Sequence, residues 1–263
     1  RLEPGDVPEN EAASALALAL VPDPGAAALT VTKAFTGRVN LLASGPGVAV
    51  LDVAAIETLN RVHPMITLAT VPQHTQMNAR GMVATIKIIS YAVPGKALEQ
   101  ACACARESVR LARPKMQNAS LIITEIPGGA GEKGRTAIEA RITALGLKKA
   151  EVCMVPHSTA ALAECLKRVG GDLTLILTGS ATSDEQDVGP AALRAAGGQV
   201  ARFGMPVDPG NLLFLGELSG RPVIGLPGCA RSPAINGADW VLSRVVCGIE
   251  VSAGDIAGMG VGG

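Results

Sequence analysis

The segment from Asp172 to Asp187, DLTLILTGSATSDEQD, decides how the second half of the chain folds. Its apolar run, Leu173–Leu177, predicts a short buried strand. The run stops at a loop of small residues that carries three acids, and the residues from 190 to 197 predict a helix that ends at glycine. A buried parallel strand that leads through such a loop into a helix leaves backbone N–H groups free at its carboxyl end. Because anionic ligands bind there in open α/β sheets, the loop predicts a binding site.

Strands and helices alternate at short spacing around this segment. We expect strands at 121–124, 151–155 and 173–177, and helices at 136–145 and 159–169, the second of them capped by Ser158. The alternation predicts a βαβαβ unit with a parallel sheet, and right-handed crossovers place its helices on both faces. Further strands are expected at 200–207, 212–218 and 222–226, the last two forming an antiparallel hairpin at the sheet edge, before a final helix at 235–246.

The first 113 residues predict a smaller α+β unit. The expected helices are 8–20, 53–62 with Asp52 as N-cap, and a long one at 96–112; the expected strands are 29–43, a hairpin-like return at 48–51, 65–71 and 82–91. Arg113-Pro114 ends the long helix, so we place a domain boundary there.

The predicted fold class is therefore α/β. It consists of a three-layer, mostly parallel sheet with helices on both faces and an antiparallel edge hairpin, preceded by the smaller α+β domain. The expected domains are an accessory or dimerisation unit at 1–113, the α/β domain at 114–250, and a glycine-rich linker tail at 251–263.

Composition narrows the class of function. Apolar residues make up 48% of the chain and aromatic residues only 2%, so the core is aliphatic and base-stacking platforms are scarce. The 23 basic residues equal the 23 acidic ones, which gives no electrostatic footprint for a nucleic acid or a membrane surface. No apolar run is long enough to cross a bilayer. The six cysteines form no C-x-x-C pair and are expected as reduced thiols of a cytoplasmic protein. The chain begins at Arg1, which we interpret as the mark of a fragment.

A second loop joins an expected strand to the last helix, with the sequence LPGCARSP at 226–233. Gly228 lets the backbone approach a ligand closely, and Ser232 can cap a helix opened by Pro233. Both loops precede helix N-termini, so both favour anions.

The order of these motifs resembles the molybdopterin-binding domain family of molybdenum-cofactor biosynthesis. In that family a strand is followed by a Gly-Gly-Thr-Gly or Gly-Gly-x-Ser-x-Gly loop, then an Asp, then a helix, and Gly179–Thr182 and Asp187 fall in this register. Members related to molybdopterin molybdenumtransferase add a Pro-Gly before a strand pair and a later Leu-Pro-Gly-Asn-Pro loop. Pro209-Gly210 and residues 226–230 are similar to these two motifs, and the resemblance covers about 116–248.

The resemblance implies a small pterin ligand, molybdopterin or its adenylylated form, with Mg²⁺ and ATP as further cofactors. It implies Asp187 as the catalytic and metal-binding carboxylate. The cofactor-binding positions that it implies are Gly179, Ser180, Ala181, Thr182, Ser183, Pro209, Gly210, Pro227, Gly228, Arg231 and Ser232. The chain also resembles bacterial proteins that join such a domain to a nucleotidyltransferase, so a fused C-terminal nucleotidyltransferase domain is an expected partner, and a homo-oligomer stays open.

Three positions depart from the family pattern. Ser180 replaces the second loop glycine, Cys229 replaces the Asn of Leu-Pro-Gly-Asn-Pro, and 124–127 read Thr-Glu-Ile-Pro in place of Thr-Gly-Asp-Glu. Two functions therefore stay open: an enzyme that transfers adenylyl or inserts molybdate with Mg²⁺, and a non-catalytic cofactor-binding or carrier module. A third hypothesis is a nucleotide-sensing domain unrelated to molybdenum.

Several side chains have two interpretations at this point. Asp187 is either a ligand-site acid or the N-cap of the next helix, and Arg231 either binds phosphate or lies on the surface. His157 either lines the cleft or has a structural role, and Lys133 is placed to reach an anion. Thr182 can donate to phosphate or simply populate a turn. No nucleophile dyad is evident, since the chain has no G-x-S-x-G motif.

Overall fold

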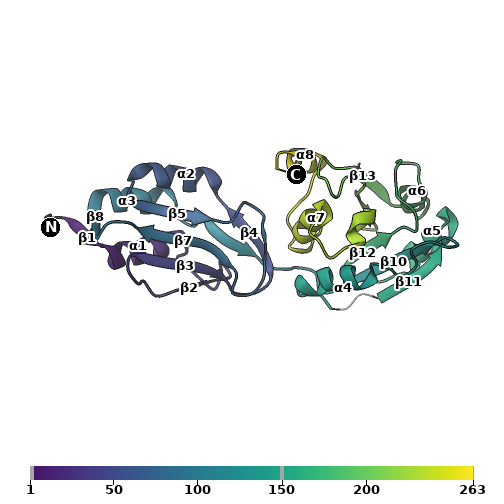
Figure 1. Ribbon diagram of the computed structural model, residues 1–263, viewed down its shortest axis with the longest axis horizontal. Helices are drawn as coiled ribbons and strands as arrows, with labels where there is room; N and C mark the ends of the chain where they lie inside the picture. The colour runs from purple at the N-terminus through teal and green to yellow at the C-terminus, as the bar shows by residue number, and fades with distance from the viewer. Residues whose placement is uncertain (1–2, 149–150, 263) are drawn as a thin grey trace. The chain divides into compact units, whose positions relative to one another are not determined.

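The computed structural model describes residues 3–148 and 151–262, and its contacts divide the chain into two compact units, Arg1–Arg113 and Pro114–Gly263 (Figure 1). Together they give the α/β class that the sequence predicts. Among the described residues, every helix is too short or too polar to cross a membrane. Because the two units are separate bodies, each is described by itself.

Over residues 3–113, the structure of unit 1 contains three small antiparallel sheets and three helices. Two sheets have the strand orders β1-β8 and β6-β4-β9, and the third is the four-stranded β2-β3-β7-β5. The elements are β1 Asp6–Pro8, α1 Glu9–Leu20, β2 Leu29–Val31, β3 Arg38–Ala43, β4 Gly47–Leu51, α2 Val53–Val62, β5 Ile66–Thr70, β6 Gln76–Met77, β7 Met82–Ile88, β8 Ala92–Pro94, α3 Gly95–Cys104 and β9 Val109–Ala112.

Local sequence signals account for two helices of unit 1, through the cap of α2 and the buried face of α1. The carboxylate of Asp52 accepts a hydrogen bond from the Ala55 N–H at 3.0 Å and so caps α2, as predicted. In α1 the buried positions include Ala13, Leu16, Ala17 and Leu20, whose spacing of three and four residues turns one face of the helix into the core.

Three predictions for unit 1 are wrong. The single strand at 29–43 is two antiparallel strands, because Thr36 and Gly37 adopt positive φ and reverse the chain. The segment 48–51 does not return on its neighbour but pairs with β9 and β6. The helix expected to continue to 112 ends at Cys104, and Val109 and Leu111 then alternate buried with Arg110 exposed, which is the period of a strand.

Unit 2 is built around one six-stranded sheet of order β11-β10-β12-β15-β14-β13. The first four strands are mutually parallel and the last two run antiparallel to their neighbours. The elements are β10 Ala119–Glu125, α4 Arg135–Ala144, β11 Glu151–Pro156, α5 Thr159–Arg168, β12 Leu173–Leu177, α6 Val188–Ala195, β13 Gln199–Phe203, β14 Phe214–Leu218, β15 Arg221–Leu226, the 3-10 helix η1 Gly228–Arg231, α7 Gly237–Val246, α8 Ala253–Ala257 and the 3-10 helix η2 Gly258–Gly260.

Alternating side chains of the sheet form two cores, which makes unit 2 three layers as predicted. Leu121 and Ile123 of β10 pack with α4 and α7 on one face, whereas Ile122 packs with α5 and α6 on the other. The predicted hairpin exists as β14 and β15, but β15 lies inside the sheet beside β12, and β13 forms the edge.

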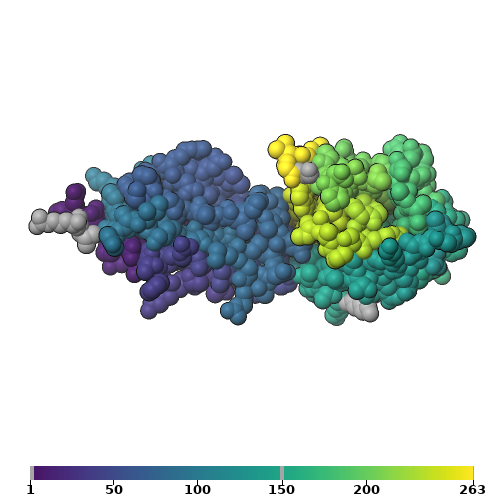
Figure 2. Space-filling view, in the orientation of Figure 1, coloured from purple at the N-terminus to yellow at the C-terminus, as the bar shows by residue number. Residues whose placement is uncertain are grey.

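The expected linker tail is folded, which corrects the prediction for 251–263. Ser252 and Asp255 form a capping box that starts α8, and η2 follows. Ile256 and Met259 are buried and belong to the core that α4 and α7 share. The segment, yellow in Figure 2, is part of the surface of unit 2. The glycine content suggested a flexible segment, but the burial of Ile256 and Met259 packs the segment against the core.

The tail is expected to contribute to the stability of unit 2. Ile256→Ala should lower the free energy of unfolding by about 2–5 kcal/mol, because it opens a cavity at a fully buried position. Urea unfolding followed by the fluorescence of Trp240, the single tryptophan of the chain, reports on unit 2. Val261→Ala, at a fully exposed tail position, is the matched control and should leave the midpoint unchanged. Equal midpoints for the two variants would contradict a packed tail.

Candidate functional site

The carboxyl ends of β10, β11 and β12 bring three polar side chains into one hydrogen-bonded chain. Thr124 Oγ1 lies 2.7 Å from Nδ1 of His157, and the other ring nitrogen, Nε2, lies 2.9 Å from Oγ of Ser180. Thr124 is fully buried, His157 is half-buried and Ser180 is exposed. Because these strands are parallel, their ends meet at one edge of the sheet, where α/β proteins bind ligands. The chain of side chains therefore runs from the core to the surface at the predicted site.

Gly179 follows β12, and its backbone lies close to the end of the neighbouring parallel strand β10. A Cβ atom at this position would lie 2.8 Å from the carbonyl oxygen of Thr124, closer than real Cβ contacts. The Gly179 N–H donates to Thr124 Oγ1 at 2.8 Å, so the same close approach positions the hydroxyl that meets His157. The close approach of the neighbouring strand therefore explains the glycine at 179 without any ligand.

The side chains of Thr178 and Thr182 hold the loop after β12 in shape. Thr178 Oγ1 donates to the carbonyl of Ser180 at 2.8 Å, so its single hydrogen is used. The hydroxyl of Thr182, 3.1 Å away, must then donate to Thr178. Thr182 is buried, and its hydroxyl stabilises the loop, which is the second of the two interpretations of this residue.

Asp187 closes the same loop from its far end. Its Oδ2 accepts the N–H groups of Ser183 at 2.6 Å and Asp184 at 3.0 Å. Asp187 occupies the N-cap position of α6, but its carboxylate turns back to the loop and does not cap the helix. Within the described residues Oδ1 accepts no hydrogen bond, so this oxygen is available for a ligand.

Three successive backbone N–H groups of the loop have no acceptor among the described residues. They belong to Ser180, Ala181 and Thr182, between the N–H of Gly179, which bonds Thr124, and those of Ser183 and Asp184, which bond Asp187. These three N–H groups are backbone donors of the loop that are available to a ligand.

Arg231 joins the second loop to the first. Its guanidinium donates to the carbonyl oxygens of Thr178 at 2.7 Å and Lys133 at 2.5 Å, and burial lowers its pKa. Gly134 lets this happen, because a Cβ there would lie 2.7 Å from the backbone and side chain of Arg231, and its φ is +95°. Arg231 therefore donates these hydrogen bonds to the protein's own backbone. The sequence suggested either phosphate binding or a surface position, and neither interpretation includes this arrangement.

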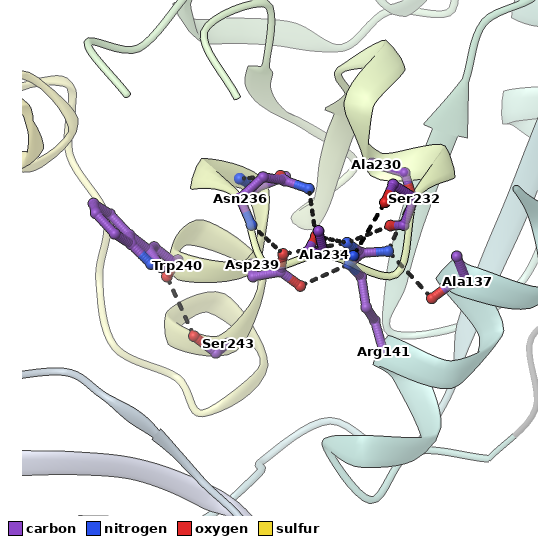
Figure 3. A network of polar contacts seen from close by, with 10 residues as sticks. Ala137, Arg141, Ala230, Ser232, Ala234, Asn236, Asp239, Trp240 and Ser243 are labelled. Carbon is purple, nitrogen blue, oxygen red and sulfur yellow. Dashed lines mark hydrogen bonds and ion pairs between the residues drawn. The ribbon is translucent and has the colours of Figure 1, made fainter. Parts of the chain in front are cut away.

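A buried ion pair between Arg141 and Asp239 holds the second loop in place (Figure 3). Arg141 of α4 donates from Nε to Asp239 of α7 at 2.7 Å, and both side chains are about one-tenth exposed. The remaining guanidinium N–H groups reach the carbonyl oxygens of Ala137, Ala230, Ser232 and Ala234. Asp239 Oδ2 also accepts the Asn236 N–H at 2.8 Å, as part of the capping box that starts α7.

Sequence reasoning missed Arg141 and Asp239, although both left a signal. Arg141 is a charged residue on the helix face of Ile138 and Ile142, where a solvated side chain has no place. Asn236 and Asp239 have the spacing of a capping box, which predicts the start of α7 at Gly237. Ser232 is therefore not the helix cap that it was predicted to be; its carbonyl binds Arg141, and η1 lies between the strand and α7.

Of the other predicted positions in unit 2, Pro209 and Gly210 have structural contacts and Gly228 has none. The carbonyl of Pro209 accepts the N–H of Gly237 at 2.9 Å, and Gly210 lies against the same residue at the start of α7. Gly228 faces open space, since a Cβ there would meet nothing within 4 Å. Burial raises the pKa of the Cys229 thiol, which keeps it protonated at neutral pH.

The acids of the site fit a magnesium ion only in its phosphate-bound form. In the described part of the chain no three His, Cys, Asp or Glu side chains gather into a complete metal site. Mg²⁺ is commonly held by one or two carboxylates and completed by substrate phosphates and water, so Oδ1 of Asp187 suits such an ion. Asp184, whose Oδ1 accepts the Gln186 N–H, is a loop acid.

The Arg141–Asp239 pair is expected to be needed for the stability of unit 2. Arg141→Ala should lower the free energy of unfolding by about 3–5 kcal/mol, because it leaves a buried carboxylate without its counter-charge. Arg135→Ala on the same helix removes partly exposed pairs with Glu132 and Glu139 and should change the midpoint less. Urea unfolding monitored at Trp240 compares the two, and an equally small effect of both would refute a structural role for the buried pair.

Comparisons with known proteins give limited information. No family model and no curated protein matches the chain. Among solved structures, the crystal structure of a molybdopterin biosynthesis MoeA protein from Pyrococcus horikosii aligns with a TM-score of 0.39 and 16% identity, over 80% of this chain and 69% of that one. At such a distance, function has to be argued from the residues of the site.

Proposed function

We propose that unit 2 binds molybdopterin, or its adenylylated form, with the phosphate at the loop Gly179–Asp187. The observation that carries the proposal is the run of three unpaired N–H groups at Ser180, Ala181 and Thr182, at the carboxyl end of the parallel strand β12. The order of the loop, Pro-Gly and Leu-Pro-Gly motifs along the sequence supports the same ligand class. Six free cysteines and a balanced charge suit a cytoplasmic protein with a small-molecule ligand.

In this proposal the phosphate is bound by backbone dipoles and one hydroxyl. Arg231 is already bonded to Thr178 and Lys133, so its role is to hold the two loops together. A phosphate needs hydrogen-bond donors at close range, and consecutive N–H groups supply them without a net charge. The pterin would extend toward Gly228, where a Cβ atom would meet nothing within 4 Å.

Asp187 would hold Mg²⁺ through Oδ1, with phosphate oxygens and water completing the shell. The ion would supply charge neutralisation for phosphates, including those of ATP in an adenylyl transfer. The protein would contribute positioning, since Oδ2 fixes the loop through Ser183 and Asp184 and thereby fixes the distance between carboxylate and N–H groups.

A carrier module is the second candidate, and Ile126 and Pro127 favour it. The resembled family has an acid pair at these two positions, two residues after the Thr that Thr124 matches. Without those acids, unit 2 would bind the cofactor and present it to a fused or partner nucleotidyltransferase domain. Turnover of ATP with molybdopterin by the purified chain would exclude the carrier function and establish the enzyme.

Binding is tested by titrating the purified chain with molybdopterin in the presence of Mg²⁺ and following heat release. We expect saturable binding. Thermal unfolding with molybdopterin, ATP or CTP then separates the ligand classes, because a ligand of the native state raises the midpoint. A rise with nucleotides alone would favour the nucleotide-sensing hypothesis, and the absence of saturable molybdopterin binding would exclude the proposal.

The magnesium role of Asp187 has its own test. Asp187→Asn keeps an oxygen acceptor for the Ser183 and Asp184 N–H groups but removes the charge, so it should abolish the Mg²⁺ dependence of binding without unfolding the loop. Asp184→Asn is the matched control, an exposed acid three residues away, and should retain that dependence. Equal Mg²⁺ dependence in both variants would place the ion elsewhere.

A further inference from the structure

Ser180 and His157 look at first like a nucleophile with its base. The hydroxyl oxygen of Ser180 lies 2.9 Å from Nε2 of His157, and the second ring nitrogen is held by a third residue, Thr124, at 2.7 Å. This is the geometry of an activated serine, in which Nε2 must be unprotonated to accept the hydroxyl hydrogen. Which ring nitrogen carries the hydrogen therefore decides what the site does.

A count of hydrogens at Thr124 settles this choice. Its hydroxyl oxygen already accepts the N–H of Gly179 at 2.8 Å, and it has a single hydrogen to donate. The side chain is fully buried, and among the described residues Nδ1 of His157 is its one other partner. If Nδ1 carried a hydrogen, the Thr124 hydrogen would be buried without an acceptor, which is unfavourable. Thr124 therefore donates to Nδ1.

We propose that Thr124 holds His157 as the neutral Nε2–H tautomer, so that Ser180 presents its hydroxyl hydrogen to the ligand and takes an acceptor-only anion such as a phosphate oxygen. Nε2–H donates to Ser180 Oγ, which leaves the Ser180 hydrogen to point outward from an exposed side chain. Donors then run in one direction, from Gly179 N–H through Thr124 and His157 to Ser180.

The neighbouring loop presents donors of the same kind. The unpaired N–H groups of Ser180, Ala181 and Thr182 are hydrogen-bond donors, like the outward hydroxyl, and all belong to one short segment. A chain of hydrogen bonds polarises each member, which strengthens the outer donor. Thr124 and His157 are thus positioning residues, and Ser180 is a ligand-binding donor and not a nucleophile. The identity of the anion as a pterin phosphate rests on the proposed function, whereas the tautomer does not.

The tautomer is measured directly in the unaltered protein. Long-range ¹H–¹⁵N spectra of the full chain labelled at histidine resolve three side chains, His63, His74 and His157, and His157→Gln assigns the third. Under mildly alkaline conditions we expect His157 to show a protonated Nε2 and an unprotonated Nδ1. Thr124→Val should shift it toward the Nδ1–H form, and Thr124→Ser, which keeps the hydroxyl, should not. An Nδ1–H tautomer in the unaltered protein would overturn the inference.

A second measurement tests the role of Ser180. Ser180→Ala should weaken the binding of inorganic pyrophosphate about tenfold, the usual effect of losing a hydrogen bond to a charged group, while His157 keeps its tautomer. Thr143→Ala removes an exposed hydroxyl of α4, outside the loop, that donates to the carbonyl of Glu139; it is the control and should bind like the unaltered protein. A fluorophosphonate probe should leave Ser180 unlabelled, and its labelling would identify a nucleophile and overturn the inference.

The outcomes separate the two proposals. An Nε2–H tautomer together with pyrophosphate binding, in a chain that does not bind molybdopterin, would support the donor site and exclude the pterin ligand. Molybdopterin binding with an Nδ1–H tautomer would support the proposed function and exclude the donor chain.

Discussion

Unit 2 depends on one buried cation, Arg141, whose guanidinium N–H groups are all bonded inside the protein. Four of its contacts are backbone carbonyls of α4 and of the segment before α7, and the fifth partner is the carboxylate of Asp239. A buried charge without such partners is very unfavourable, so the segment 230–236 has little freedom to adopt another path. The irregular segment 230–236 is thereby held in one conformation at the carboxyl end of β15.

The position of the segment 230–236 also determines the geometry of the candidate site. Once 230–236 is fixed, Arg231 reaches the carbonyls of Thr178 and Lys133 and holds the end of β12 against the segment that contains Lys133 and Gly134. Gly179 then approaches the end of β10 closely enough to bond Thr124. The guanidinium groups of Arg141 and Arg231 bind backbone carbonyls, and in the proposed function the phosphate is bound by backbone N–H groups and a hydroxyl. Under that proposal short-range dipoles take the place of long-range attraction by a net positive charge.

The same arrangement separates binding from turnover. In the proposed function the hydrogen-bond donors of the loop hold a phosphate in place, and the side chains around Ser180 supply hydrogens and not a strong base. Asp187 is the carboxylate best placed to recruit Mg²⁺, and one of its oxygens already serves the loop. Chemistry at this site would have to come from the ion and a second substrate positioned beside it, or from a partner domain to which the cofactor is passed.

The sequence by itself determined the features that depend on neighbours along the chain: the buried strand β12, the caps at Asp52 and Ser158, and the alternation that makes unit 2 three layers. These follow from local periodicity and capping, which a short window contains. Tertiary structure alone decided the strand β9 and the folded tail, because each depends on partners distant in sequence. It also decided the site: Thr124, His157 and Ser180 meet only when three parallel strands end together, and Arg141 finds Asp239 across 98 residues. Such contacts are fixed by how the layers pack, and no local pattern carries that information.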